Sequence, residues 1–456
     1  MIGEESDTRY PLTAQQQDPD QTERHSKLVI PMVWRITGEL QVDALQAALD
    51  EVVARHEALR TRIHYDETGG GGYQEVVPPL PVPFTVQDIP LPAGQAREQR
   101  VLDLYVMANE QRLDFSAVPS LQAKLYRFDD QDAVFTAQTH HLFGDHWSIG
   151  VFRREVAACY NARVNGRPHS LRPPVQYREY STWQREFLQS QKAATARQFW
   201  LDTLAGAQLV TLPTDRPFDP DTMAAQSVVR TYRLDSQDTA RMSASAARNR
   251  CSVWHLLLAA VMVLTEQVRG STDITLLTVN NSRDVKDFRG TIGFFANLIP
   301  LHLSYGDCRS FQELMLLARR TSVAAHQNAI PIREILGLVP DLMNSFGAPG
   351  AMPFVFNYVK RSPLVAEFQF ADKVEPVVAS EEVPAMYHRG ACSWDVEILV
   401  SGALRCVVEY EPSMVDTETI DRWGSEFINL LRMIADRPEQ AWQPAADRRQ
   451  QSGRRE

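Results

Sequence analysis

Hydrophobic and polar residues alternate along residues 31–37 (PMVWRIT), a period of two that predicts a β-strand. The segment that follows has apolar residues at steps of three and four, the spacing of an amphipathic helix, and one histidine shares that stripe: Leu45, Leu49, Val52, His56 and Leu59. Four glycines at positions 69–72 come next. A phosphate-binding loop would need a Gly-Lys-Ser or Gly-Lys-Thr ending, which is missing, so the glycines predict a flexible hairpin loop.

A second strand is predicted at residues 133–139 (AVFTAQT), and a helix follows it with an apolar stripe of Ile149, Phe152, Val156 and Tyr160. Ser148 stands where the N-cap of this helix is expected. The stretch THHLFGDHWSIG, residues 139–150, therefore lies in a strand-to-helix connection. Connections of this kind often carry functional side chains on a rigid scaffold.

The rest of the chain continues the mixture of helices and strands. Helices are predicted at residues 176–188 and 253–268, a strand at residues 274–280, and a last helix over residues 420–434. Ser310 and Glu313 have capping-box spacing before a further helix that runs through Ala325. Because helices and strands alternate in both halves, the pattern favours two α/β lobes, each with a sheet covered by helices.

The domain boundaries are predicted from the breaks between these elements. Residues 165–176 (NGRPHSLRPPVQ) are polar and rich in glycine and proline, as linkers often are. The expected organisation is an N-terminal lobe at residues 1–165, a linker at 166–176, a C-terminal lobe at 177–440 and a disordered tail at 441–456. The tail is predicted to be disordered because it has no apolar periodicity.

Composition narrows the possible functions. The chain has 456 residues, of which 44% are hydrophobic, and it carries 47 basic against 57 acidic side chains. A net charge of −10 argues against a nucleic-acid partner. The polar start and the short apolar runs indicate a cytoplasmic protein with no membrane association. The cysteines are scattered without a C-x-x-C pair, so neither a disulfide framework nor a zinc ribbon is indicated: Cys159, Cys251, Cys308, Cys392 and Cys406.

Residues 139–150 allow three interpretations. A metal site could use His140, His141, Asp145 and His146, but neighbouring residues on a strand point to opposite faces and no glutamate lies at helical spacing, so no metal is predicted. The four residues could also be satisfied polar groups at a strand end. In the third interpretation one neutral imidazole takes a proton from an amine or hydroxyl, which needs no activated serine or cysteine if the acyl donor is a thioester. The pattern alone leaves the last two open.

A family resemblance favours the catalytic interpretation. HHLFGDHWS, residues 140–148, resembles the H-H-x-x-x-D-G-x-S signature of the condensation domains of non-ribosomal peptide synthetases. Further similar segments follow in the family's order from about residue 10 to residue 435: YPLTAQQ at 10–16, RHEALRTRI at 55–63, YREYSTWQRE at 177–186, LPTDRP at 212–217, NSRDVKDFRGTIGFFANLIPLHL at 281–303 and AHQNAIPIREIL at 325–336. The resemblance therefore covers essentially the whole chain.

The resemblance implies a fold and an activity. The fold would be two chloramphenicol-acetyltransferase-like α/β lobes in a V-shaped pseudo-dimer with a tunnel between them. The activity would be that of a condensation enzyme in natural-product biosynthesis, forming an amide or ester bond. The donor would be an acyl or aminoacyl thioester on the phosphopantetheine arm of a carrier protein acting in trans, and the acceptor a small-molecule amine or alcohol. No bound cofactor is implied.

The resemblance also implies roles for single residues. His141 matches the second motif histidine, the base or nucleophile-positioning group. Asp145 matches the motif aspartate, which in the family pairs with an arginine at the position of Arg283, as a structural brace. His140 and Ser148 would support the motif. Asn297, after the I-G-F-F segment, would either line the tunnel or satisfy backbone groups.

The sequence departs from the family at one motif position. His146 replaces the usual glycine, so its imidazole would narrow the tunnel or add a second titrating group. Carrier-protein and adenylation motifs are not found, which predicts a free-standing enzyme. Two alternatives stay open: an acyltransferase of the same superfamily that uses coenzyme A thioesters, and a non-catalytic module that recruits another enzyme to a carrier protein.

Overall fold

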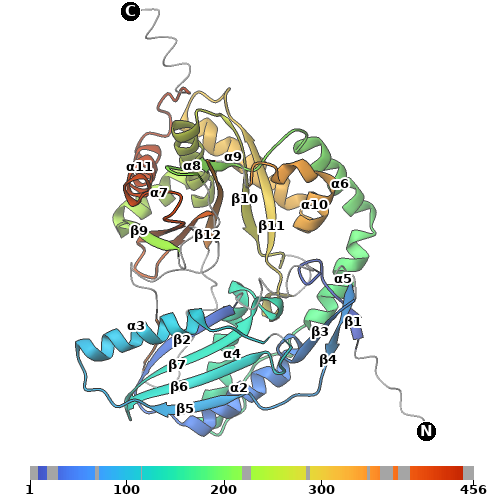
Figure 1. Ribbon diagram of the computed structural model, residues 1–456, viewed down its shortest axis with the longest axis vertical. Helices are drawn as coiled ribbons and strands as arrows, with labels where there is room; N and C mark the ends of the chain where they lie inside the picture. Colours follow the sequence, from blue (N-terminus) through green and yellow to red (C-terminus); the bar gives the residue numbers. More distant parts are fainter. Residues whose placement is uncertain are drawn as a thin grey trace, which may run out of the picture. The chain divides into compact units, whose positions relative to one another are not determined.

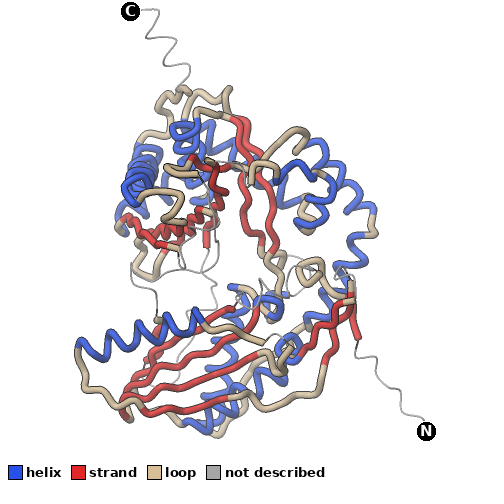
Figure 2. Tube along the Cα trace, in the orientation of Figure 1, coloured by secondary structure: helices blue, strands red, loops and turns tan. Residues whose placement is uncertain are grey.

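The computed structural model describes residues 9–17, 29–66, 71–114, 116–217, 227–283, 288–346, 350–359, 373–377 and 391–444. These residues form two compact units. Unit 1 contains the described residues up to Ser190, together with those of 281–297 and 362–380. Unit 2 contains the described residues of Gln191–Asn280, of 298–361 and from Glu381 onward. Each unit contains both helices and strands (Figure 2), which confirms the predicted mixed α/β fold class with two lobes.

A five-stranded sheet forms the centre of unit 1 (Figure 1). Its strands are, in spatial order, β13 (Lys373–Pro376), β2 (Val29–Thr37), β7 (Asp132–His140), β6 (Leu121–Asp129) and β5 (Phe84–Asp88). Neighbouring strands are antiparallel except β5 and β6. Every residue of the central strand β7 is buried, so His140, its last residue, lies at the end of a rigid strand.

Helices cover both faces of this sheet. Helices α2 (Val42–Arg55) and α4 (His146–Val164) pack on the face that presents Met32 and Trp34 of β2. Helix α3 (Gln95–Glu110) packs on the opposite face, against Val33. Successive residues of a strand point to opposite sides, so one strand contributes to both apolar cores.

A smaller antiparallel sheet completes unit 1 with short helices around it. Its strands are β1 (Arg9–Pro11), β4 (Gly72–Val76) and β3 (Thr61–Tyr65). The pairing of Tyr65 with Gly72 confirms the predicted hairpin, although residues 67–70 lie outside the described residues. The remaining helical segments of this unit are η2 (Glu57–Arg60), η3 (His141–Phe143), α5 (Tyr177–Leu188) and η5 (Phe288–Gly290).

Unit 2 is built on a seven-stranded mixed sheet. The spatial order is β11 (Asn297–Ser304), β10 (Asp273–Asn280), β12 (Ala351–Val359), β14 (Cys392–Ile398), β15 (Leu404–Tyr410) and β9 (Val228–Leu234), and β8 (Thr211–Pro213) pairs with β12. Its helices are α6 (Gln191–Thr203), α7 (Ser236–Arg248), α8 (Val253–Arg269), α9 (Phe311–Gln327), α10 (Ile332–Leu338), η6 (Pro340–Met343) and α11 (Thr417–Asp436). The predicted helix at residues 253–268 corresponds to α8, and the predicted last helix corresponds to α11.

Within the described ranges, no single helix is long and apolar enough to cross a membrane. Helices α7 and α8 meet the criteria of length and composition only as a pair, with a bend of 99° between them.

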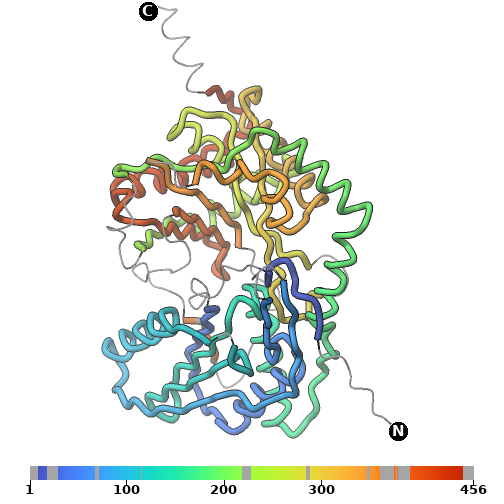
Figure 3. The backbone as a smooth tube through the Cα atoms, turned by 45° about the vertical axis from the view of Figure 1, so that its right-hand side comes forward, coloured from blue at the N-terminus to red at the C-terminus, as the bar shows by residue number. Residues whose placement is uncertain are grey.

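The observed units differ from the predicted lobes because the chain returns to unit 1 after leaving it (Figure 3). Helix α5 packs against β1 and η2, so unit 1 extends to Ser190, well beyond the predicted linker at 166–176. The described residues of 281–297 also belong to unit 1, and β13 pairs with β2 there. Apolar periodicity is local and does not reveal such returns. The V-shaped arrangement and the tunnel stay predictions.

The predicted disordered tail is wrong at its start. Trp442 is 4% exposed, and its backbone N–H donates to the carbonyl of Arg309 over 2.8 Å. Burial of this indole explains the order of residues 441–444. Residues 445–456 lie outside the described residues.

Candidate active site

The motif begins where β7 ends. His140, the last residue of the strand, is 1% exposed, and its Nδ1 accepts a hydrogen bond from the backbone N–H of Leu142 over 3.1 Å. This contact turns the chain into η3, so the two histidines are no longer consecutive residues of one strand. His140 therefore shapes the backbone that presents its neighbour.

The His141 ring is half-buried and packs against Phe294 at 5.0 Å between ring centroids, with 55° between the ring planes. Its Nδ1 is buried and makes no hydrogen bond to the described residues. Burial lowers the pKa of His141 below its usual 6.5, against an opposing effect of the Asp145 carboxylate. The imidazole is therefore neutral near pH 7 and has a proton-accepting nitrogen.

Asp145 is the N-cap of α4. Its Oδ1 accepts hydrogen bonds from the backbone N–H of Ser148 over 2.9 Å and from the Arg283 guanidinium over 2.8 Å. Its Oδ2 accepts from the backbone N–H of Phe295 over 3.1 Å. Burial alone would raise the pKa of this carboxyl, but Arg283 and the hydrogen bonds to Ser148 and Phe295 lower it. Asp145 is thus an ionised brace, not a proton acceptor.

Ser148 is not the N-cap, and the sequence-based assignment of that role is wrong. The apolar stripe indicated a helix that begins at Ile149. The helix instead begins at His146, three residues earlier, because the Asp145 side chain caps it. The Ser148 hydroxyl lies 2.8 Å from Asp145 Oδ1 and 3.0 Å from the carbonyl of Gly293, to either of which it can donate, and it accepts from the backbone N–H of Gly293 over 3.2 Å. It links the helix start to a distant segment.

Arg283 is 1% exposed and binds the same segment. Its Nη1 donates to the carbonyls of Phe288 and Thr291, over 3.0 and 2.6 Å, while Nη2 reaches Asp145. The guanidinium carbon lies 4.0 Å from the ring centroid of Phe295, a cation–π distance. One buried cation therefore organises both the helix start and the segment that faces it.

We call residues 288–295 the strap. Five consecutive residues of the strap are each held by a hydrogen bond between their backbone and a buried side chain: Thr291 by Arg283, Ile292 by His56, Gly293 by Ser148, Phe294 by Tyr177 and Phe295 by Asp145. Backbone groups that are satisfied in this way cannot shift without leaving a buried polar group unpaired. The strap is therefore a fixed support for the His141 ring.

Gly293 shows how closely the strap is packed. A Cβ atom at this position would lie 2.1–2.7 Å from atoms of the Tyr177 ring, closer than any real contact. The Tyr177 hydroxyl meanwhile donates to the carbonyl of Phe294 over 2.7 Å. Only glycine allows the strap to pass so close to this ring. Tyr177 and Gly293 belong to two of the segments that resemble the family, and this contact gives a physical reason why the two occur together.

The two residues predicted to line a substrate path differ in exposure. His146 is the first residue of α4 and is exposed. Asn297 follows the strap as the first residue of β11 and is 6% exposed. Their predicted contact with substrate stays a prediction.

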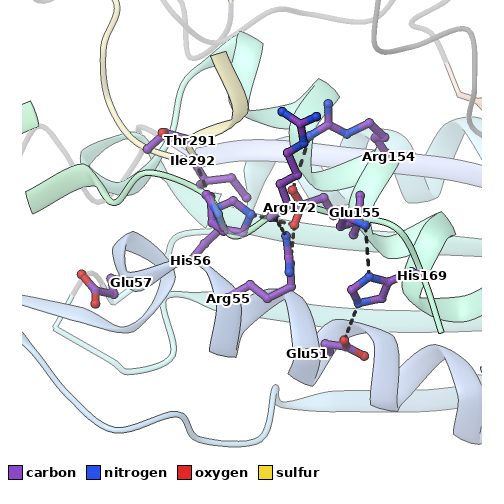
Figure 4. Close-up of polar contacts among 12 residues, drawn as sticks. Glu51, Arg55, His56, Glu57, Arg154, Glu155, His169, Arg172, Thr291 and Ile292 are labelled. Atoms are coloured by element: carbon purple, nitrogen blue, oxygen red, sulfur yellow. Dashed lines mark hydrogen bonds and ion pairs between the residues drawn. The ribbon is translucent and has the colours of Figure 1, made fainter. Parts of the chain in front are cut away.

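His56 and Glu155 are functional candidates that the sequence analysis missed. The apolar stripe had indicated that the helix continues through His56 to Leu59. Instead, α2 ends at Arg55 and His56 is its C-cap. Its Nε2 lies 2.9 Å from Glu155 Oε2, and Arg55 Nε donates to the same oxygen over 2.8 Å (Figure 4). A glutamate beside the apolar stripe of α4 was the available signal, because buried carboxylates need partners.

One group of side chains resembles a metal site. Glu51, Cys159 and His169 place their ligand atoms within 4.8 Å of one another. His169 Nδ1 accepts from the backbone N–H of Leu171, so its Nε2 carries the proton and donates to Glu51 over 2.7 Å. Burial raises the pKa of the Cys159 thiol to about 12. The donor set is therefore satisfied by protons and hydrogen bonds, and it does not favour a metal ion.

Comparison with known proteins agrees with this geometry. The family model for the Condensation domain matches residues 6–446. A linear gramicidin synthase polypeptide of Brevibacillus parabrevis is 27% identical over 421 residues, which is 90% of this chain and 8% of that protein. Chondramide synthase cmdD of Chondromyces crocatus is 28% identical over 417 residues, 89% of this chain and 10% of that protein. The chain thus spans a tenth or less of these relatives.

Solved structures show the same fold. The SgcC5 protein from Streptomyces globisporus superimposes with a TM-score of 0.79 at 26% identity, covering 91% of this chain and 94% of that chain. The X-domain from teicoplanin biosynthesis superimposes with a TM-score of 0.78 at 22% identity, covering 95% and 96%. The fold is therefore that of these proteins.

Proposed function

Because this chain belongs to the condensation-domain family, we propose that it joins a carrier-bound acyl or aminoacyl thioester to an amine or alcohol acceptor. Family members form amide bonds on substrates carried by phosphopantetheine. The observation that carries the proposal for this chain is the placement of His141. Its ring is half-buried and packs against Phe294 of the strap, next to the residue whose backbone Asp145 binds, and burial lowers its pKa.

The proposed reaction is a direct acyl transfer. The acceptor nitrogen or oxygen attacks the thioester carbonyl, a C–N or C–O bond forms, and the C–S bond breaks. His141 accepts the proton of the acceptor and returns it to the departing thiolate, so the imidazole ends as it began. General-base assistance of this kind contributes about 10²–10⁴-fold in rate, and correct placement of the two reactants contributes about 7–11 kcal/mol.

Asp145 and Arg283 act in this proposal as positioning residues. Their ion pair is buried and joins the start of α4 to the strap. A preorganised loop keeps the base in place without reorganisation during the reaction. His146 is proposed to line the path of the substrate because its exposed ring adjoins the motif, and Asn297 because it follows the strap.

The test measures unloading of a carrier protein by intact mass. Carrier protein loaded with octanoyl or phenylalanyl thioester is mixed with the protein and either phenylalaninamide or its hydroxy analogue, 3-phenyllactamide. Wild type is expected to give the amide or ester, and His141→Ala to form it much more slowly. His64→Ala is the control, since His64 pairs with Glu75 on the small sheet and contacts neither the motif nor the strap.

A parallel reaction with octanoyl- and phenylalanyl-coenzyme A separates the two enzymatic alternatives. Product from the carrier form alone supports the proposal, whereas equal product from both forms indicates a coenzyme A-dependent acyltransferase. Tight binding of the carrier protein without any turnover would instead identify a recruitment module and overturn the catalytic proposal.

A further inference from the structure

A buried pair outside the motif contacts the strap at the backbone of Ile292. His56 and Glu155 are 1% and 2% exposed, and they join the end of α2 to the middle of α4 over 2.9 Å. Arg55 contributes the balancing charge, with its Nε 2.8 Å from the same carboxylate oxygen. Figure 4 shows His56 between Glu155 and the backbone around Thr291 and Ile292.

The protonation of the His56 ring follows from its two contacts. The backbone N–H of Ile292 points at Nδ1 over 3.4 Å, so Nδ1 must be the acceptor. Nε2 then carries the proton and donates to Glu155. A proton on Nδ1 would face the Ile292 N–H and break this contact. The carboxylate therefore sets the tautomer, as second-layer carboxylates commonly do for histidine.

The contact at Ile292 is one of the five that hold residues 291–295 of the strap, and its partner His56 lies at the end of α2. Ile292 lies between Thr291, whose carbonyl Arg283 binds, and Gly293, which Ser148 binds. Phe294, two residues further, packs against the His141 ring. A shift of the backbone at Ile292 would therefore move the surface on which the proposed base rests.

We propose that His56 is a positioning residue: with Glu155 it fixes the strap backbone at Ile292 and thereby the orientation of His141. This inference rests on the proposed function, because the orientation of His141 matters for a rate only if His141 serves the reaction. The geometry of the strap itself can be measured without turnover.

Two isosteric substitutions separate the two contacts of the ring. His56→Asn places a carboxamide oxygen at the position of Nδ1 and keeps an acceptor for the Ile292 N–H. His56→Gln places an amide N–H₂ at the position of Nε2 and keeps a donor for Glu155 but loses the strap contact. The matched control pair is His169→Asn and His169→Gln. Like His56, His169 bonds a glutamate (here Glu51 of α2, over 2.7 Å), but it touches no strap residue.

The expected result is a split between the two variants of His56. His56→Gln should lower kcat for octanoyl-carrier and 3-phenyllactamide by about 10- to 100-fold with little change in KM, since small misplacements of reacting groups have effects of this size. His56→Asn should stay within about threefold of wild type. Hydrogen exchange at the Ile292 amide should accelerate in His56→Gln and not in His56→Asn.

Three outcomes decide the matter. The first outcome is that kcat falls in both variants of His56 only as far as their loss of stability explains, and that the His169 variants behave in the same way. The positioning role would then be wrong. If wild type has no turnover but exchange at Ile292 follows the predicted split, the proposed function fails and the strap contact stands. Nitrogen NMR of the wild-type His56 ring needs no variant, and a protonated Nδ1 at about pH 7.5 would overturn the inference.

Discussion

Arg283 and Asp145 are 138 residues apart in the sequence, yet the guanidinium Nη2 lies 2.8 Å from the carboxylate Oδ1. Both side chains are almost fully buried, at 1% and 2% exposure. Removing two charges from water is expensive, so such a pair persists only with good geometry and further hydrogen bonds. Here those bonds come from Ser148 and from the backbone of the strap.

Breaking this pair from one side should destabilise the protein strongly. Asp145→Ala leaves the Arg283 charge buried without a partner, and the free energy of unfolding should fall by about 3–5 kcal/mol. Urea denaturation measures this change. The control is Asp88→Ala, which breaks an exposed surface pair with Arg127 and should leave stability nearly unchanged. Equal losses in the two variants would contradict the assignment of Asp145 as a brace.

Loss of the proposed base should affect ester formation more than amide formation. An α-amine has a pKa of about 7.7–8.0, so a good part of it is already neutral at physiological pH, whereas a hydroxyl depends on a base to lose its proton. His141→Ala should therefore slow the reaction with 3-phenyllactamide more than that with phenylalaninamide. Relative rates under the same donor concentration provide the measurement, and equal losses would refute the role of general base.

The pH profile of the wild type follows from the environment of His141. Burial lowers the pKa of this imidazole below 6.5, and only the neutral ring accepts a proton. As pH falls, the rate should therefore decline with a midpoint below pH 6.5. The alcohol acceptor is the right substrate for kcat/KM, because an amine titrates in the same range. A midpoint at or above pH 6.5 would contradict this environment for His141.

Acid stability should depend on Glu155. Burial alone would raise its pKa, but the hydrogen bonds donated by His56 and Arg55, together with the charge of Arg55, hold the pKa at about 2, below its usual 4.5. A carboxyl with a depressed pKa stabilises the fold above about pH 4.5, and this contribution disappears as pH falls towards 2. Glu155→Gln should therefore be less stable than wild type at neutral pH, by roughly 3 kcal/mol.

The difference between Glu155→Gln and wild type should shrink as pH falls from about 4.5. Denaturant titrations at a series of pH values measure it. A difference that stays constant down to the lowest pH at which both proteins fold would show that the ionised carboxylate is not what stabilises the pair.

Two glycines near the motif should respond differently to an added methyl group. At Gly293 a Cβ would collide with the Tyr177 ring, and Gly293→Ala should lower stability by about 1–3 kcal/mol and reduce acyl transfer. At Gly144 the nearest atoms to a Cβ are 3.6–3.8 Å away and the backbone is extended, so Gly144→Ala should leave stability nearly unchanged. Thermal denaturation of both variants makes the comparison. A tolerated Gly293→Ala would mean that the strap can move away from Tyr177.

Local pattern was enough to predict many elements. The alternation at residues 31–37 and 133–139 corresponds to β2 and β7, and the stripe from Ile149 to Tyr160 lies within α4. Residue identity in family order was enough to pair Asp145 with Arg283, and the observed 2.8 Å contact has the predicted partners. These predictions succeeded because the period of a helix or strand, and the order of motifs, are written in neighbouring residues.

Tertiary structure decided which distant groups meet. Sequence periodicity placed His56 on a helical stripe and Ser148 at a helix cap, whereas folding made His56 a C-cap bonded to Glu155 and gave the N-cap to Asp145. The return of residues 281–297 to unit 1 also has no local signature. A buried polar group needs a partner, but the partner can come from any part of the chain, and only the folded arrangement selects it.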